Sequence, residues 1–336
     1  MHRNSIVLAC LLVSAAAPAL SQSGYYRQPA PAPQVPPPAA TPAATPEVAA
    51  SVRPSAGALK PIIALQKAYA SKDPAAIASA LAAAKAAAAT KEDRYVIGQL
   101  QLRAALAAND NAETGAAIEL VAGSGYLPAG KAAELYMAYG NGLSEKKQYA
   151  EAAAAFERGL ALDPNNLGLL GNLGEARFAQ GRKAEAIPYF QKLIAATIAT
   201  GVKPSEPVYK RAVSIANEAK LPVSVELASS WVVAYPSPVS WSNAIALYQN
   251  VNKPDVEGSL NLLRLLRATG AMSSPAHYSL YSTAAADQGN YVEAQAVIDE
   301  GLAKNVFTAS SPVIKDVIAG LKAKQKATAA DLETAS

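Results

Sequence analysis

The chain has 336 residues, of which 51% are apolar and 17% charged, and its net charge is +4. This apolar content supplies a packed core and excludes a globally disordered chain. The positive charge is small for this length, and the densest basic segment, 315–326, holds only four lysines, which favours a solvated helix face. We therefore expect no nucleic-acid partner, because that function needs a clustered basic surface.

Residues 1–21 have the pattern of a secretory signal peptide. Arg3 gives a positive start, segment 6–17 is apolar or small, and the small residues of Ala19–Ser21 suit cleavage. This predicts an exported protein, periplasmic or secreted. No later stretch reaches the ~18 uninterrupted apolar residues of a membrane span, so no transmembrane segment is expected. Residues 7–10, which end at the single cysteine Cys10, resemble a bacterial lipobox, but few apolar residues precede them. If Cys10 is removed with the signal peptide, the mature chain has no thiol chemistry.

Residues 22–56 form a segment rich in proline and alanine. Eight of the 18 residues from Pro29 to Pro46 are proline. Such a composition lacks the apolar bulk that offsets ordering entropy, and it favours extended polyproline II. The segment is predicted to be a disordered linker, with a docking site for a proline-recognising partner as the alternative.

From residue 57 to 326 the sequence predicts one helix after another. An N-cap Asp or Ser followed by proline marks helix starts at Asp73–Pro74, Ser237–Pro238, Ser274–Pro275 and Ser311–Pro312. The last three starts are 37 residues apart, and a fixed period of this size indicates a solenoid. No strand-like alternation is found. The predicted helices are 58–71, 74–89, 92–108, 111–122, 129–144, 148–161, 166–180, 183–199, 206–219, 222–234, 238–250, 255–269, 275–288, 291–304 and 312–325.

Residues 133–166 carry a spaced set of aromatic and small residues. They are Tyr136, Tyr139, Gly140, Leu143, Ala152, Phe156 and Pro164. This set resembles the tetratricopeptide repeat (TPR). Gly140 and Ala152 are expected to face each other where two helices cross, and Tyr136 and Phe156 to fill the layer between helices. Proline after Asp163 ends the second helix, because it disfavours helical backbone in the residue before it.

Two further segments resemble the same family. Segment 167–200 has matching residues at Gly174, Gly181, Ala186 and Phe190, and segment 275–307 at Tyr278, Gly289, Tyr291, Ala294 and Gly301. Residues 262–307 are also similar to exported bacterial TPR proteins. The resemblance implies an all-α fold, a right-handed superhelical solenoid of antiparallel helix pairs over 57–326. Helix 312–325 is expected to cap it, with a frayed tail at 327–336; whether 58–122 forms true TPR units stays open.

The search for catalytic chemistry finds no complete motif. After signal removal His277 is the remaining histidine, whereas a zinc site needs three or four ligands. Ser144–Lys147 matches Ser-x-x-Lys but lacks its companion motifs, and no Gly-x-Ser-x-Gly elbow occurs. We therefore predict a chain that is not an enzyme and that uses no cofactor or metal.

The family resemblance implies that ligands bind on the concave face, which the first helix of each pair lines. The candidate groove residues are mainly small or polar: Glu134, Met137, Asn141, Gly168, Gly171, Asn172, Glu175, Ser242, Ala246, Gln249, Ser279 and Thr283. Asn141 and Asn172 stand where some members have the asparagines of a carboxylate clamp. Met137 stands where that clamp has a lysine, so this activity is not expected.

These residues predict an interaction scaffold of the bacterial cell envelope, which binds a partner protein or peptide in its groove. One alternative is a glycan- or peptidoglycan-associated module, which exposure of Trp241 and Tyr248 would support. Another is an enzyme of unrecognised type, which a deep pocket with convergent carboxylates would support. Fold alone does not separate these functions.

Overall fold

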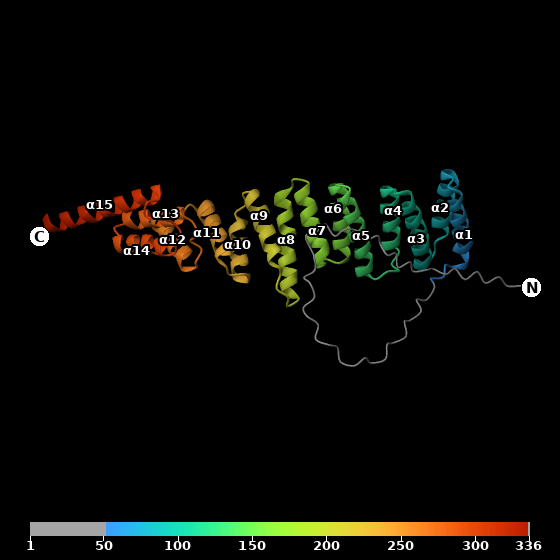
Figure 1. Cartoon of the computed structure of the whole chain (residues 1–336). Coiled ribbons are helices and arrows are strands. Elements are labelled where there is room, and N and C mark those ends of the chain that lie inside the picture. Colours follow the sequence, from blue (N-terminus) through green and yellow to red (C-terminus); the bar gives the residue numbers. More distant parts are fainter. Residues whose placement is uncertain (1–51, 335–336) are drawn as a thin grey trace, which may run out of the picture. The chain divides into compact units, whose positions relative to one another are not determined.

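A computed structural model describes residues 52–334, so the predicted signal peptide and the predicted linker up to residue 51 lie outside the described residues. Within 52–334 all regular structure is helical (Figure 1). The helices are α1 (Ala56–Ser71), α2 (Pro74–Ala87), α3 (Lys91–Ala108), α4 (Asn111–Ala122), α5 (Ala129–Glu145), α6 (Tyr149–Leu162), α7 (Leu167–Ala179), α8 (Lys183–Ala199), α9 (Glu206–Glu218), α10 (Val223–Ala234), α11 (Pro238–Asn252), α12 (Val256–Ala268), α13 (Pro275–Asp287), α14 (Tyr291–Ala303) and α15 (Pro312–Thr334). This confirms the all-α prediction. The chain divides into two compact units, unit 1 up to Leu193 and unit 2 from Ile194.

The helix starts that were predicted from Asp-Pro and Ser-Pro pairs are confirmed. The side chain of Asp73 accepts a hydrogen bond from the Ala75 amide, and that of Ser237 accepts one from the Ser240 amide. Ser274 caps α13 in the same way. Each cap satisfies one of the amides that a helix leaves unpaired in its first turn, which is why these local residues fix where helices begin.

In unit 1, helices α1 and α2, α3 and α4, and α5 and α6 pack as neighbouring pairs, and α7 packs on α6. Gly140 of α5 lies against the ring of Phe156, so a Cβ at this position would overlap the ring. Gly174 of α7 lies against Phe190 in the same way, because a Cβ added at Gly174 would be 2.9 Å from the ring. Gly140 and Phe156 thus recur 34 positions later as Gly174 and Phe190. The expected partner of Gly140, Ala152, is buried beside it, but Phe156 is the side chain in closest contact.

Replacing Gly140 with leucine is expected to lower the free energy of unfolding of unit 1 by about 1–3 kcal/mol, the usual cost of overpacking a close contact. Gly142→Leu is the matched control on the same helix, because a Cβ there meets nothing within 4 Å. Loss of a helical glycine should leave the control neutral or more stable. The measurement is urea unfolding followed by circular dichroism; equal midpoints in the two variants would contradict the helix-pair packing.

The start of unit 1 differs from the prediction, which extended the linker to residue 56. Val52 packs against the core of α1 to α4, and Ser55 caps α1 by accepting a hydrogen bond from the Ala58 amide. The amide and the hydroxyl of Ser55 both donate to the Asp93 carboxylate, at 2.7 and 2.8 Å. Residues 52–55 therefore belong to the folded unit, held by a residue 38 positions away.

In unit 2, α9 pairs with α10 and α13 with α14, while α11 packs on α10 and α12 on α13. The core between α12 and α15 is built around Tyr278 and Tyr281, both fully buried. Gly301 of α14 lies against the rings of Phe307 and Tyr278. Gly159 of unit 1 has the equivalent contact, with Leu169 and with the Cβ of Tyr136.

The C-terminal helix α15 packs on both α13 and α14, as a capping helix should. Ile314 and Leu321 are buried, and Val317 and Ile318 pack against the same core. Val313, near the start of the helix, is instead 60% exposed. The predicted frayed tail is helical as far as Thr334, since no glycine or proline follows Gly320 to end the helix.

Candidate functional site

The first helices of the α5–α6 and α7–α8 pairs bring two predicted groove positions together in unit 1. The Nδ2 of Asn172 donates a hydrogen bond to the Oδ1 of Asn141, at 2.8 Å, and the pair is exposed. One turn earlier on each helix, the sulfur of Met137 lies over Gly168, 2.9 Å from where a Cβ would stand. Both pairs are 31 residues apart, so α5 and α7 run side by side in register. We call Met137, Asn141, Gly168 and Asn172 the α5–α7 face.

The other predicted groove residues of unit 1 lie around this face. Glu134 is exposed and forms an ion pair with Lys131, at 2.9 Å, and Glu175 is half-buried. Gly171 is buried, so the prediction that it lines the groove is wrong. The reason is helical geometry: a residue adjacent to Asn172 lies about 100° around the helix and turns toward the core.

A polar network joins the turn between α3 and α4 to the turn between α5 and α6. The Nζ of Lys146 donates to the Oδ1 atoms of Asn109 and Asn111, at 2.9 and 2.8 Å. The Nδ2 of Asn111 donates to Gln148, and the hydroxyl of Tyr139 donates to the Asn111 carbonyl. These bonds fix adjacent helix pairs against each other. The turn that contains the Ser-x-x-Lys match, Ser144–Lys147, therefore has a structural role.

In unit 2 the predicted groove residues lie on α11 and α13. Ser242 and Gln249 are half-buried on α11, as is Ser279 on α13, whereas Ala246 and Thr283 are exposed. Thr283 lines a crevice of about 280 Å³ whose other wall is α15, with Asp316 and Lys324. Lys324 also forms an ion pair with Asp287 of α13. The capping helix thus lies beside a part of α13 that was predicted to line an open groove.

The two aromatic residues that would support glycan binding differ in exposure. Trp241 is half-buried and packs against the core of unit 2. Tyr248 is 43% exposed. Only Tyr248 therefore presents an aromatic surface large enough to stack on a sugar.

An ionic network that was not found from the sequence links α12, α13 and α14. The guanidinium of Arg264 donates two hydrogen bonds to Glu293, at 2.8 and 2.7 Å, and the hydroxyl of Tyr281 donates a third at 2.6 Å. The Arg264 hydrogen bonds lower the pKa of Glu293 to about 2. Burial and the hydrogen bond to Glu293 raise the pKa of Tyr281 to about 12. Both shifts hold the groups in their usual protonation states near neutral pH, so charged hydrogen bonds link α12, α13 and α14.

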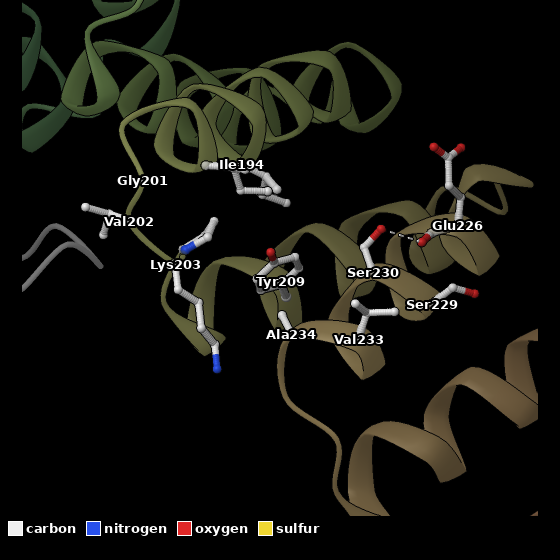
Figure 2. A pocket seen from close by; sticks show the side chains of 12 residues that line it. Ile194, Gly201, Val202, Lys203, Tyr209, Glu226, Ser229, Ser230, Val233 and Ala234 are labelled. Carbon is white, nitrogen blue, oxygen red and sulfur yellow. Dashed lines mark hydrogen bonds between the residues drawn. The ribbon is translucent and has the colours of Figure 1, made fainter.

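A groove that the sequence did not predict lies in unit 2, between α8 and α10 (Figure 2). Its volume is about 640 Å³. It is lined by Ile194, Ile198, Gly201, Val202, Lys203, Pro204, Tyr209, Glu226, Ser229, Ser230, Val233 and Ala234. Val233, which lies in the apolar run Trp231–Ala234, is 84% exposed. We call this surface the α8–α10 groove.

Over residues 52–334, no three His, Cys, Asp or Glu side chains gather as ligands for a metal ion. None of the helices in the same range is long and apolar enough to cross a membrane.

Residues 143–197 match the sequence family described as Tetratricopeptide repeat. No curated protein sequence matches the chain. Among solved structures, the chain is similar to YrrB, a TPR protein described as having an unusual peptide-binding site (14% identity, 55% of this chain, 90% of that chain, TM-score 0.35). It is also similar to Pseudomonas aeruginosa PilF (14%, 68% and 99%, TM-score 0.30) and to the C-terminal part of a TPR repeat-containing protein from Cytophaga hutchinsonii (14%, 76% and 98%, TM-score 0.39).

At these scores the structural likenesses add no argument of their own. The assignment follows from the matched segment and from the helix pairs around it, in which Gly140 and Phe156 recur as Gly174 and Phe190. The chain therefore contains a tetratricopeptide repeat, which is recognised at residues 143–197.

Proposed function

We propose that this protein is a non-catalytic scaffold of the bacterial cell envelope that binds an extended peptide segment of a partner protein on the α5–α7 face. TPR arrays in general offer extended surfaces for protein partners. Export is part of the proposal, and the composition of residues 1–21 supports it.

The paired amides of Asn141 and Asn172 are the observation that carries the proposal. Their mutual hydrogen bond leaves the amide nitrogen of Asn141 as a donor and the carbonyl oxygen of Asn172 as an acceptor. One donor beside one acceptor complements the C=O and N–H of a single peptide unit. Main-chain hydrogen bonds of this kind give affinity without demanding one sequence.

Met137 adds an apolar contact next to this polar pair. Its side chain lies across Gly168, where the absence of a Cβ lets the thioether lie flat on α7. Methionine is flexible and polarizable, and it adapts to different apolar side chains. The α5–α7 face therefore suits a partner that is recognised through its backbone and through one apolar side chain.

The glycan alternative has less support, because Trp241 packs against the core and Tyr248 alone is exposed. The enzyme alternative called for a deep pocket with convergent carboxylates. The α8–α10 groove is open and mostly apolar, with Glu226 as its one carboxylate.

The double variant Asn141→Ala with Asn172→Ala is expected to lose most partner binding while keeping its fold. Each hydrogen bond lost to a neutral partner weakens binding by about 0.5–1.5 kcal/mol, so the loss of two should reduce affinity by roughly five- to 150-fold. The measurement is comparative capture: envelope and cytoplasmic fractions are passed over immobilised wild type and variant, and the retained proteins are compared by mass spectrometry.

Asn165→Ala is the matched control, because Asn165 is an exposed asparagine in the turn between α6 and α7. A true partner is retained by wild type and by the control, comes from the envelope fraction and is lost with the double variant. Identical sets of retained proteins for all three would contradict binding on the α5–α7 face. A variant-sensitive partner from the cytoplasmic fraction would contradict the envelope role alone.

A further inference from the structure

The α8–α10 groove combines a hollow and a projection on one surface of unit 2. Val233 of α10 is 84% exposed, and Ile198 and Val202, on the opposite wall, are 55% and 58% exposed. Figure 2 shows the side chain of Val233 on α10, near Ser229, Ser230 and Ala234. All three line the same groove, so its rim is an exposed apolar surface of the kind that interaction sites use.

The two serine hydroxyls on the α10 side of the groove already have hydrogen-bond partners within the helix. The hydroxyl of Ser229 donates to the Val225 carbonyl at 2.9 Å, and that of Ser230 donates to the Glu226 carbonyl at 3.0 Å. Because these hydroxyls are already hydrogen-bonded within α10, covering them leaves no donor unsatisfied. Their small size also lets another helix approach closely.

Two opposite charges stand at the two ends of α10. Glu226 lies in its first turn. At the other end the Nζ of Lys203 lies 3.7 Å from the ring centroid of Tyr235, the residue that follows the helix. Positions 226 and 235 are about 13 Å apart along a helix axis at 1.5 Å per residue. Ser230 lies midway between them.

We propose that the α8–α10 groove is the self-complementary interface of a two-fold homodimer. In a two-fold contact the same patch serves on both copies, so each feature must find its complement within that patch. When two α10 helices cross antiparallel at Ser230, Lys203 of each copy meets Glu226 of the other. Val233 of each copy then enters the groove of the other. The patch therefore supplies both the projection and the hollow, and both signs of charge.

Sedimentation equilibrium of the purified chain over a concentration series tests this proposal. The wild type is expected to sediment as a dimer and Val233→Asp as a monomer, because a charge replaces the apolar projection. Val292→Asp is the matched control, since Val292 is 86% exposed on α14 and does not line the groove. It should remain a dimer. A wild type that is monomeric throughout, or a Val233→Asp variant that still dimerises, would overturn the proposal.

A charge exchange tests the antiparallel pairing itself. In the two-fold dimer, position 203 of each copy faces position 226 of the other. In the Lys203→Glu variant both of these contacts bring two carboxylates together. In the Glu226→Lys variant both bring two ammonium groups together. Each variant should be monomeric by itself. An equimolar mixture of the two restores both attractive pairs and should form a heterodimer. Since neither variant dimerises alone, recovery on mixing also shows that both are folded. If the wild type dimerises but the mixture stays monomeric, the pairing of Lys203 with Glu226 is wrong.

Discussion

Deleting residues 312–336 is expected to destabilise unit 2 and to cause aggregation. The deletion removes α15, and with it two buried side chains, Ile314 and Leu321, from the core shared with α13 and α14. Burial of one such side chain stabilises a protein by about 1.5–3 kcal/mol, so these two alone account for about 3–6 kcal/mol. The deletion also bares the apolar surface of the last helix pair, which repeat arrays cover with a terminal cap.

The control for this experiment removes residues 327–336 only. This truncation keeps Ile314, Val317, Ile318 and Leu321, which pack on the core. Thermal unfolding by circular dichroism and light scattering at a fixed protein concentration compare the two truncations with the intact chain. The short truncation should melt like the intact chain, and the long one should melt earlier and scatter light. Equal melting curves for all three would show that α15 does not act as a cap.

Replacing Asp93 with asparagine is expected to lower the free energy of unfolding of unit 1 by about 2–4 kcal/mol at neutral pH. The buried Asp93 carboxylate accepts the amide and hydroxyl of Ser55 and the amides of Ala89 and Thr90, at 2.7 to 3.0 Å. An asparagine keeps one acceptor oxygen and turns an NH₂ group toward a donor. The variant therefore detaches the start of α1 from the start of α3.

The same carboxylate makes stability depend on pH. Burial by itself would raise the pKa of Asp93, but hydrogen bonds from Ser55 and Thr90 outweigh it and lower the pKa from 3.8 to about 2. A depressed pKa stabilises the folded state above the unfolded pKa, and this contribution is lost as the pH falls from about 4 to 2. The shift corresponds to about 2 kcal/mol.

Urea unfolding at pH 7 and at pH 2.5 measures both effects, with Asp110→Asn as the control. Asp110 is an exposed N-cap, and asparagine caps a helix equally well. The control should follow the wild type at both pH values. Asp93→Asn should be less stable at pH 7 and should lose less on acidification. A variant as stable as the control at pH 7 would contradict the role of Asp93.

Local sequence signals determined the helices of this protein. Caps at Asp73, Ser237 and Ser274 and the periodicity between them placed the helix boundaries within about two residues, apart from the end of α15. The repeats predicted at 133–166 and 167–200 overlap the matched segment 143–197, because their small and aromatic residues have fixed spacing. These signals act within one turn of helix or within one pair, so they need no knowledge of distant contacts.

Only the tertiary structure decided which face of a helix is covered and by what. The bond between Ser55 and Asp93 spans 38 residues, and that between Arg264 and Glu293 spans 29, so neither leaves a local trace. In the candidate site, the sequence named Asn141 and Asn172, but their hydrogen bond required α5 and α7 in register. Val233 is apolar and yet 84% exposed, because burial depends on which neighbouring helix packs against a residue and not on the hydrophobicity of the residue itself.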